Sequence, residues 1–238
     1  HLRLSGFKVW DLCDFYERFW RKVPIFYLKD NWFFLSEGFS LFHNPIGLRI
    51  KRILDVLGAT ALLLFTFPIM LVTALFIRLE SKGPTLFKQV RTGLDGKKFT
   101  MIKFRSMHQD AEKNGAQWAT KDDNRITKVG KFIRLTRIDE LPQLINVLAG
   151  EMSFVGPRPE RPEFNEMLEK QLPYYQMRHL VRPGISGWAQ ILYPYGASIE
   201  DATEKLQYEL YYIKNYSLLM DVQVTLKTIA VVLFGRGR

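Results

Sequence analysis

Two adjacent carboxylates, Asp139 and Glu140, stand shortly before Pro142. Because proline is tolerated in a helix only within its first turn, we expect Asp139 at or near a helix N-terminus. Backbone N–H groups there favour an anion, either the carboxylate itself or a bound phosphate. Neighbouring helical residues point about 100° apart, so the two carboxylates should take separate roles rather than share a proton. The competing interpretation is an ordinary solvated acidic pair with a capping Asp.

Basic residues beside prolines accompany the acidic pair. Arg158 lies between Pro157 and Pro159, and Arg182 precedes Pro183. A guanidinium held in one orientation suits bidentate contact with phosphate. Each arginine alone is a weak signal, but together with the carboxylates they indicate an anion site of the kind that phosphoryl transfer with Mg²⁺ requires. Further positive charge comes from Arg134 and Arg137 just upstream of the pair, and from Lys103 and Arg105 at the end of an expected hairpin.

The elements that must position these residues indicate an α+β fold that is mainly helical. Residues 84–104, with the turn-forming Asp95-Gly96, predict a short β-hairpin. Helical spacing occurs in 130–135, 140–148, 162–172 and 202–215, and Gly150 is a plausible stop for the second of these. An apolar stripe from Leu218 to Leu233 predicts a further helix, either part of the core or lying on a membrane surface.

Residues 56–77 hold no charged side chain, and this run exceeds the roughly 20 residues that an α-helix needs to cross a bilayer. Pro68 at its middle should kink or break the helix. Basic residues flank both ends, so the positive-inside rule gives no clear orientation. We favour a re-entrant helix–break–helix that dips into one leaflet, with both flanks cytoplasmic, although the sequence leaves a kinked spanning helix equally open.

This membrane segment divides the chain into three expected regions: 1–48, 49–80 and 81–238. The first is rich in aromatic residues, which suit a belt at headgroup level, a docking surface, or a small core shared with an upstream domain. Since position 1 is His rather than Met, we expect a processed terminus or a fragment of a longer protein. The third region contains the acidic pair and the basic residues that accompany it.

Composition limits the possible classes of protein. Lys and Arg number 34 against 24 Asp and Glu, a net charge of +10, and 47% of residues are hydrophobic. That apolar content excludes disorder for most of the chain, and the charge favours phosphates, nucleic acid or an anionic membrane face. The single cysteine, Cys13, excludes an internal disulfide and a Cys-rich zinc site, and four scattered histidines argue against a His-built metal centre. These counts favour a reducing compartment.

From about residue 50 to the C-terminus, four motifs occur in order. They are Lys103-Phe104-Arg105-Ser106-Met107, Asp139-Glu140-Leu141-Pro142-Gln143, Ser153-Phe154-Val155-Gly156-Pro157-Arg158-Pro159 and Arg182-Pro183-Gly184-Ile185-Ser186-Gly187-Trp188. Their order and spacing closely resemble the bacterial sugar transferases, also called monotopic phosphoglycosyl transferases or polyprenyl-phosphate hexose-1-phosphate transferases. The chain after Leu206 is similar to the exopolysaccharide branch, whose longer members carry upstream membrane helices and a soluble domain.

The resemblance implies that a sugar 1-phosphate passes from a UDP-sugar to undecaprenyl phosphate, with release of UMP and with Mg²⁺ as cofactor. It implies Asp139 as the nucleophile of a phosphosugar–aspartyl intermediate and Glu140 as a metal ligand. It also implies substrate or phosphate contacts by Lys103, Arg134, Arg158 and Arg182. The reaction would be the first membrane step of exopolysaccharide or capsule assembly, on the cytoplasmic face of the bacterial inner membrane. Residues 81–238 would then form the cytoplasmic catalytic domain, with membrane-associated C-terminal helices.

The partners expected from the resemblance are a UDP-hexose (glucose or galactose, with an N-acetylated sugar also open), undecaprenyl phosphate and the bilayer. No nucleic acid is expected, and the aromatic N-terminal region could support a homodimer. The chain departs from the small family members at Phe67, where they have Ser before the helix-breaking Pro. The hydrogen bonding at that break is therefore open.

Two other classes of protein would share some of these features. A soluble metal-dependent glycosyltransferase could use Asp122-Asp123-Asn124 as its acidic metal motif, and it would release UDP instead of UMP. A non-enzymatic, membrane-anchored basic module would explain the charge and the anchor, and its phosphate contacts should depend steeply on salt. That module would leave Asp139 and Glu140 without a task.

Overall fold

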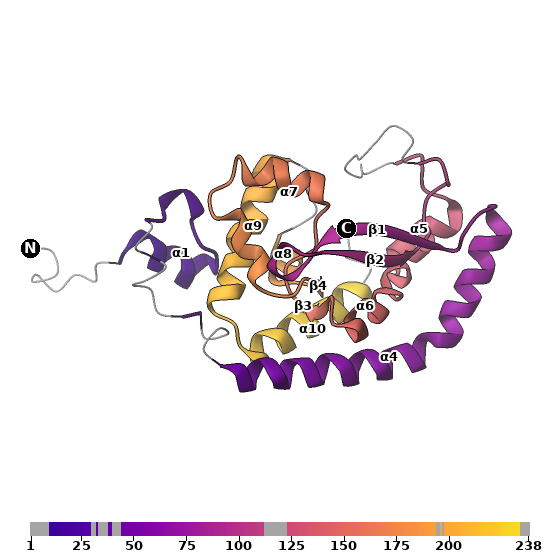
Figure 1. Ribbon diagram of the computed structural model, residues 1–238, viewed down its shortest axis with the longest axis horizontal. Helices are drawn as coiled ribbons and strands as arrows, with labels where there is room; N and C mark the ends of the chain where they lie inside the picture. Colours follow the sequence, from indigo (N-terminus) through magenta and orange to yellow (C-terminus); the bar gives the residue numbers. More distant parts are fainter. Residues whose placement is uncertain are drawn as a thin grey trace, which may run out of the picture.

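The computed structural model describes residues 10–29, 32, 38–39, 44–111, 123–193, 196 and 198–233. In this part of the chain, helices surround two small two-stranded sheets (Figure 1). The expected α+β, mainly helical fold is confirmed. The helices are α1 (Leu12–Trp20), α4 (Pro45–Glu80), α5 (Lys128–Leu135), α6 (Gln143–Ala149), α7 (Pro162–Glu169), α8 (Trp188–Leu192), α9 (Ile199–Lys214) and α10 (Leu218–Leu233).

The longest element is α4, which contains 36 residues and includes Pro68 in its interior. It runs beneath the rest of the molecule and then turns upward beside α5 (Figure 1). The expected break at Pro68 is wrong, because the helix bends and continues. Proline removes one N–H group, but its fixed φ of about −65° is itself helical, so the turns on either side can hold the helix together. Thr66 and Thr73 also donate their hydroxyls to the carbonyls of the preceding turn.

Both ends of α4 are tied to the remainder of the fold by polar contacts. Near its start, Asp55 accepts hydrogen bonds from Ser153 Oγ and Phe154 N, both at 3.1 Å. At its end, Glu80 accepts the backbone N–H groups of Lys128 and Val129, at the N-terminus of α5. Because a carboxylate at a helix N-terminus satisfies otherwise unpaired N–H groups, this last contact links α4 to α5.

Arg105, from the first of the four sequence motifs, also holds the end of α4. Its side chain is buried, and it donates to the carbonyl oxygens of Ser81 and Lys82 at 2.8 and 3.0 Å. Arg105 therefore fixes the chain where α4 ends and the hairpin begins, instead of adding its charge to the acidic pair.

The expected hairpin is confirmed as β1 (Leu86–Thr92) and β2 (Lys98–Phe104), which pair antiparallel from Leu86 opposite Phe104 to Thr92 opposite Lys98. Asp95 and Gly96 both have positive φ at the turn, as tight connections of this kind require. Asn146 of α6 accepts from Ile102 N and donates to Thr100 O. The hairpin thus leans on α6, where a small core forms from Ala59, Phe99, Met101, Leu144, Val147 and Met152.

The predicted helices at 130–135, 140–148, 162–172 and 202–215 correspond to α5, α6, α7 and α9, and α6 ends at Gly150 in the left-handed conformation. The main core lies among α7, α8, α9 and the start of the chain, where Val23 and Ile25 pack with Leu206 and Leu210 of α9. The N-terminal helical segment therefore shares a core with the region expected to be catalytic.

A parallel strand pair, β3 (Ser153–Val155) and β4 (Gly184–Ser186), joins these parts. The chains around it approach so closely that a Cβ on Gly184 would lie 2.1 Å from Gly156 N. Only glycine allows this approach, and Gly156 leads directly into the arginine turn of the third motif.

Apolar side chains remain exposed along α4, and only 17% of its most apolar stretch of 18 residues is buried. Large apolar side chains are also exposed on two other helices, with Phe132 and Leu135 on α5 and Leu219, Val222 and Leu226 on α10. A helix of 36 residues with this composition is long enough to cross a membrane. These helices are consistent with membrane association of the described part of the chain.

Candidate active site

The acidic pair lies in a short 3₁₀ turn, η4 (Ile138–Glu140), between α5 and α6. Arg137 enters this turn with φ 58°, a left-handed conformation that reverses the chain after α5. Leu141 and Pro142 continue with helical dihedral angles, so Asp139 stands one turn before α6 rather than inside it. Both acidic side chains are buried. The interpretation as an ordinary solvated pair is therefore wrong, because the turn aims them into the structure.

Three basic side chains surround one oxygen of Glu140. Lys103 Nζ lies 3.1 Å, Arg158 Nη2 2.9 Å and Arg137 Nη1 3.7 Å from Glu140 Oε1. Burial acts to raise the pKa of Glu140, but the charges of Lys103, Arg158 and Arg137 outweigh it and hold this pKa well below its usual range. Burial also lowers the pKa of Lys103, against the attraction of Glu140. Glu140 thus organises a cluster of cations while remaining ionised.

Asp139 has the opposite electrostatic character. Burial and the neighbouring Glu140 carboxylate raise the pKa of Asp139 to about 6, against the opposing charges of Lys103, Arg134 and Arg137. Its Oδ1 atom is buried and has no hydrogen-bond partner among the described residues. A buried polar atom without a partner is rare and calls for an explanation. A carboxylate oxygen kept free of donors, with cations nearby, is suited to nucleophilic attack on a phosphate.

The two carboxylates therefore differ in environment, as expected from their adjacent positions. The structure brings together Asp139, Glu140, Lys103 and Arg158, and Arg134, in the last turn of α5, is close enough to influence the pKa of Asp139. Residues from β2, α5, η4 and the arginine turn meet here, although more than 50 positions separate Lys103 from Arg158 in sequence.

Arg182 is placed differently. Its Nε donates to the carbonyl oxygen of Gly150 at 2.9 Å, beyond the C-terminus of α6. Arg52 of α4 donates to the carbonyls of Val147 and Leu148 in the same region. Cations are favourable at a helix C-terminus, so the described contacts of Arg182 are with the end of α6, not with the acidic pair.

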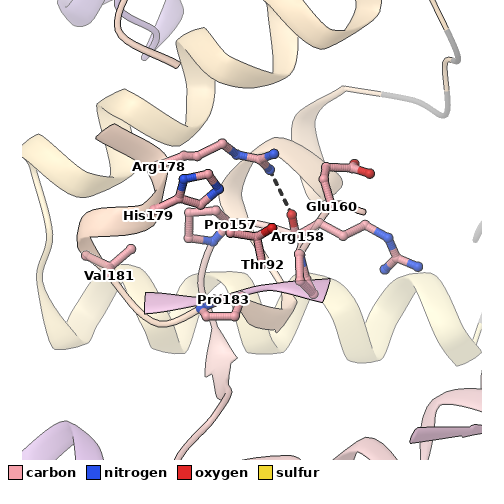
Figure 2. Close-up of a pocket in the computed structure, with 10 residues that line it drawn as sticks. Thr92, Pro157, Arg158, Glu160, Arg178, His179, Val181 and Pro183 are labelled. Carbon is pink, nitrogen blue, oxygen red and sulfur yellow. Dashed lines mark hydrogen bonds between the residues drawn. The ribbon is translucent and has the colours of Figure 1, made fainter. Parts of the chain in front are cut away.

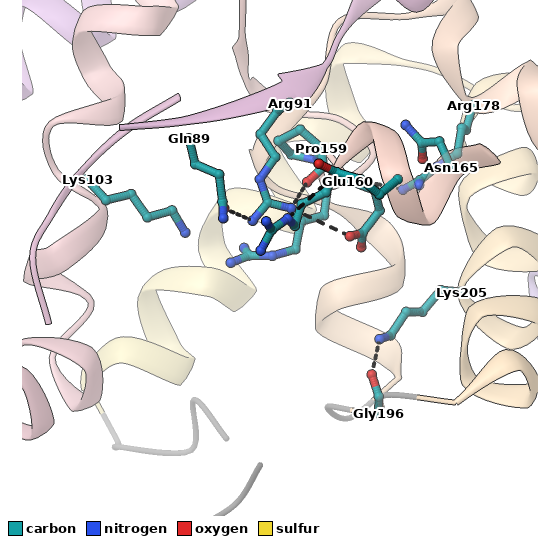
Figure 3. A network of polar contacts seen from close by, with 12 residues as sticks. Gln89, Arg91, Lys103, Pro159, Glu160, Asn165, Arg178, Gly196 and Lys205 are labelled. Atoms are coloured by element: carbon teal, nitrogen blue, oxygen red, sulfur yellow. Dashed lines mark hydrogen bonds and ion pairs between the residues drawn. The ribbon is translucent and has the colours of Figure 1, made fainter. Parts of the chain in front are cut away.

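Arg137 and Arg91 belong to this polar region but were not among the residues singled out as substrate contacts. Arg91 bonds to Gln89 and lies 3.6 Å from Glu160 (Figure 3). The hairpin register places Gln89, Arg91 and Lys103 on one face, because side chains two apart in a strand share a face and Lys103 is opposite Phe87. That alternation was visible in the sequence and could have identified Arg91.

The acidic motif of the alternative glycosyltransferase is only partly within the described residues, since Asp122 lies outside them. Asp123 forms an ion pair with Arg125, and these hydrogen bonds hold the pKa of Asp123 at about 2. This carboxylate is therefore engaged in fixing the loop before Ile126.

An apolar groove of about 720 Å³ lies between the second half of α4 and α5. Its walls include Val72 and Phe76 from α4 and Val129 and Phe132 from α5. Ile138, the residue directly before Asp139, also lines it. The groove therefore follows the second half of the bent, membrane-type helix and reaches the residue that precedes the acidic pair in sequence.

Possible metal ligands are few. Among the described residues no group of three or more His, Cys, Asp or Glu side chains is arranged to hold a metal ion. However, Mg²⁺ is commonly held by one or two carboxylates together with substrate phosphates. The bonds to Glu140 all reach Oε1, and Asp139 Oδ1 has no partner in the described part of the chain, so the pair retains oxygen atoms of the kind Mg²⁺ prefers.

A buried carboxylate among fixed cations, beside an apolar groove and a membrane-type helix, defines a membrane-associated protein with a site suited to phosphoryl transfer. The family model described as bacterial sugar transferase matches residues 46–235, and the chain belongs to that family. The resemblance inferred from the four motifs is thereby confirmed.

Several relatives have names that state an activity. The chain is 44% identical over 234 residues to the UDP-N-acetylgalactosamine-undecaprenyl-phosphate N-acetylgalactosaminephosphotransferase of Aeromonas hydrophila, which covers 98% of the chain and 54% of that protein. It is 42% identical over 188 residues to the UDP-glucose:undecaprenyl-phosphate glucose-1-phosphate transferase of Klebsiella pneumoniae, covering 78% of the chain and 40% of the relative. The protein of that name from Caulobacter vibrioides is 40% identical, covering 82% of the chain and 73% of the relative. The chain thus spans about half the length of the Aeromonas hydrophila and Klebsiella pneumoniae relatives.

Proposed function

We propose that this chain is the catalytic part of a phosphotransferase that moves a hexose 1-phosphate from a UDP-sugar to undecaprenyl phosphate and releases UMP. The names of the relatives support this reaction. The observation that carries the proposal is Asp139 Oδ1, a buried carboxylate oxygen without a described partner beside three cations gathered on Glu140.

The proposed reaction has two steps at Asp139. Its carboxylate attacks the sugar-bearing phosphorus of the UDP-sugar, the bond from that phosphorus to the bridging oxygen breaks, and UMP leaves with that oxygen. The phosphate of the lipid then attacks the same phosphorus, and the Asp139 carboxylate departs unchanged. Lys103 and Arg158 neutralise the negative charge of the diphosphate, which would otherwise repel the attacking carboxylate.

Mg²⁺ is the proposed cofactor, held by Glu140 together with the diphosphate. When bound, it would neutralise the charge that develops on the leaving UMP. Glu140 remains ionised because the basic residues around it hold its pKa low, and an ionised carboxylate is the form that a hard divalent ion requires.

The groove between α4 and α5 is the proposed place for the isoprenoid chain of the lipid. Its apolar walls suit a hydrocarbon chain, and Ile138, which lines it, directly precedes Asp139 in the sequence. The chain would lie on the cytoplasmic face of the bacterial inner membrane. In this topology α4 is re-entrant: it dips into the cytoplasmic leaflet, and both of its ends stay on the cytoplasmic side. In this position the lipid phosphate and the cytosolic UDP-sugar both reach the same carboxylate.

This topology predicts the result of a labelling experiment. Cysteines introduced at Arg49 and Lys82, both exposed and on opposite sides of the apolar run, should resist a membrane-impermeant thiol reagent applied from the periplasm and react after the cells are opened. Cys13, which is 4% exposed, is the native background and can be replaced by Ser. Labelling of only one introduced cysteine in intact cells would show that α4 spans the membrane.

The sugar is the least constrained part of the proposal, since the relatives carry N-acetylgalactosamine or glucose in their names. The test mixes detergent-solubilised protein with Mg²⁺ and a panel of UDP-hexoses in the absence of lipid. We expect a burst of about one equivalent of UMP with one UDP-sugar and a matching mass increase of the intact protein. UMP release only after addition of undecaprenyl phosphate would argue against the aspartyl intermediate, and release of UDP would favour the soluble type of glycosyltransferase.

A further inference from the structure

In the turn that carries Arg158, residues 157–160, every carbonyl group accepts a hydrogen bond from another part of the fold. Pro157 and Pro159 have no N–H to donate. Each of the four carbonyls nevertheless accepts a hydrogen bond: Pro157 O from Gly184 N at 2.9 Å, Arg158 O from Arg178 Nη2 at 2.7 Å, Pro159 O from Arg91 Nη1 at 3.2 Å and Glu160 O from Thr92 N at 3.0 Å. Three of these donors lie in strands described above: Gly184 in β4, and Arg91 and Thr92 in β1.

The donor to Arg158 itself is a buried side chain (Figure 2). Arg178 lies in the 3₁₀ helix η5 (Tyr175–Leu180) and forms a bidentate pair with Glu209 of α9, in which Nε and Nη2 each lie 2.9 Å from a carboxylate oxygen. Arg178 Nη1 also donates to Tyr175 OH, which in turn donates to Asn165. Both side chains of the ion pair are 6% exposed.

A buried ion pair of this kind needs an explanation other than stability. The cost of removing two charges from water can equal or exceed their attraction, and well-packed apolar residues of similar volume often replace such pairs without loss of stability. The planar guanidinium offers something that apolar residues lack, because Nη2 reaches Glu209 and the main-chain carbonyl of Arg158 together. A continuous path thus runs from Glu209 through Arg178 to Arg158, whose own guanidinium contacts Glu140.

We propose that Arg178, oriented by Glu209, is a positioning residue that fixes the backbone of Arg158 so that its guanidinium meets the acidic pair and the substrate diphosphate. This inference rests on the proposed function where its test measures kcat for UMP release. Displacement of a catalytic group by about 1 Å can cost on the order of 100-fold in rate, so the loss of one well-placed carbonyl contact has a measurable effect.

The test removes the polar link while preserving the core. In the double variant Arg178→Met/Glu209→Leu, apolar side chains replace the whole ion pair, so no unpaired buried charge remains. We expect a thermal unfolding midpoint close to that of the unchanged protein and a kcat for UMP release lower by roughly 10- to 100-fold. Lys214→Met/Glu17→Leu is the matched control, because it replaces a second largely buried ion pair that has no described contact with residues 157–160. This control should keep full activity.

Combination with Arg158→Ala separates positioning from a general structural role. If Arg178 acts through Arg158, then adding Arg178→Met/Glu209→Leu to Arg158→Ala should cause no further loss, because the group being positioned is already absent. Multiplicative losses, or an unchanged kcat in the Arg178/Glu209 variant alone, would overturn the inference.

Hydrogen exchange gives a readout that does not depend on turnover. The amides of Gly156, Gly184 and Thr92, which donate to Ser186 O, Pro157 O and Glu160 O, should exchange at least several-fold faster in the Arg178→Met/Glu209→Leu variant, while those of α6 stay unchanged. If the unchanged protein releases no UMP from any UDP-hexose, the proposed function fails, but this exchange pattern still decides whether Arg178 holds the turn. Unchanged exchange at these three amides would contradict its positioning role.

Discussion

Asp139→Asn should eliminate both the phosphosugar adduct and UMP release, with a loss on the order of 10⁴-fold or more, as is found when a covalent nucleophile is removed. The amide has nearly the shape of the carboxylate but no charge with which to attack phosphorus. Intact mass after incubation with UDP-hexose and Mg²⁺ measures the adduct, and a coupled assay measures UMP. Persistence of the adduct in Asp139→Ala, which cannot revert by deamidation, would assign the nucleophile to another residue.

The same substitution should stabilise the protein when divalent ions are absent. Burial and Glu140 raise the pKa of Asp139 from 3.8 to about 6, so the folded state favours its protonated form. The contribution of protonated Asp139 to the stability of the folded state is fully present below about pH 4 and is lost as the pH rises through 6. The side-chain amide of Asp139→Asn does not titrate. We therefore expect the free energy of unfolding of the variant to exceed that of the unchanged protein by an amount that grows between pH 4 and 6 and then levels off at about 1–3 kcal/mol. Thermal unfolding in EDTA across this range tests it. A stable but inactive variant is the outcome expected when a functional group occupies an unfavourable environment.

Glu140→Gln should have the second largest effect, because it removes the negative charge around which Lys103, Arg158 and Arg137 gather. Removing one partner of a largely buried ion pair leaves the other uncompensated, and we expect a loss of roughly 3 kcal/mol in the free energy of unfolding. UMP release should fall by about 10²- to 10³-fold, since the cations lose their arrangement and the proposed Mg²⁺ ligand is lost. Urea unfolding and the UMP assay measure the two effects.

A second substitution distinguishes the structural role of Glu140 from its catalytic role. Lys103→Met in the Glu140→Gln background removes the most buried of the uncompensated cations and should recover part of the lost stability. Activity should not recover, because neither the carboxylate nor Lys103 is restored. Recovery of activity together with stability would mean that Glu140 only maintains the fold.

The features that the sequence predicted well depend on local chemistry. Asp95 and Gly96 specify the hairpin turn, and this fixes the pairing that places Lys103 beside the acidic pair. Gly150 ends α6 because glycine adopts the left-handed conformation without strain. The motif order was sufficient to identify the family, since four weak signals in one chain constrain each other more strongly than any single one.

The remaining features depend on tertiary contacts that no local pattern encodes. Arg158 and Arg182 both precede proline, yet one guanidinium contacts Glu140 and the other the carbonyl of Gly150. Arg178 lies in a segment without a recognisable motif, and its importance follows only from its contacts with Glu209 and Arg158. Pro68 permits both a bend and a break, and the packing of α4 against α5 and α6 accompanies the bend.

The attachment of α4 at both ends, through Asp55 near its start and Glu80 at its end, couples this helix to the elements that carry the site. In the proposed topology a helix held in this way moves together with the site, so the depth of α4 in the membrane would set the height of Asp139 above the hydrocarbon. The thickness of the surrounding bilayer would then affect the proposed reaction, because a thicker or thinner leaflet shifts the lipid phosphate relative to Asp139. Lipid composition would thus tune turnover without any ligand binding to the protein.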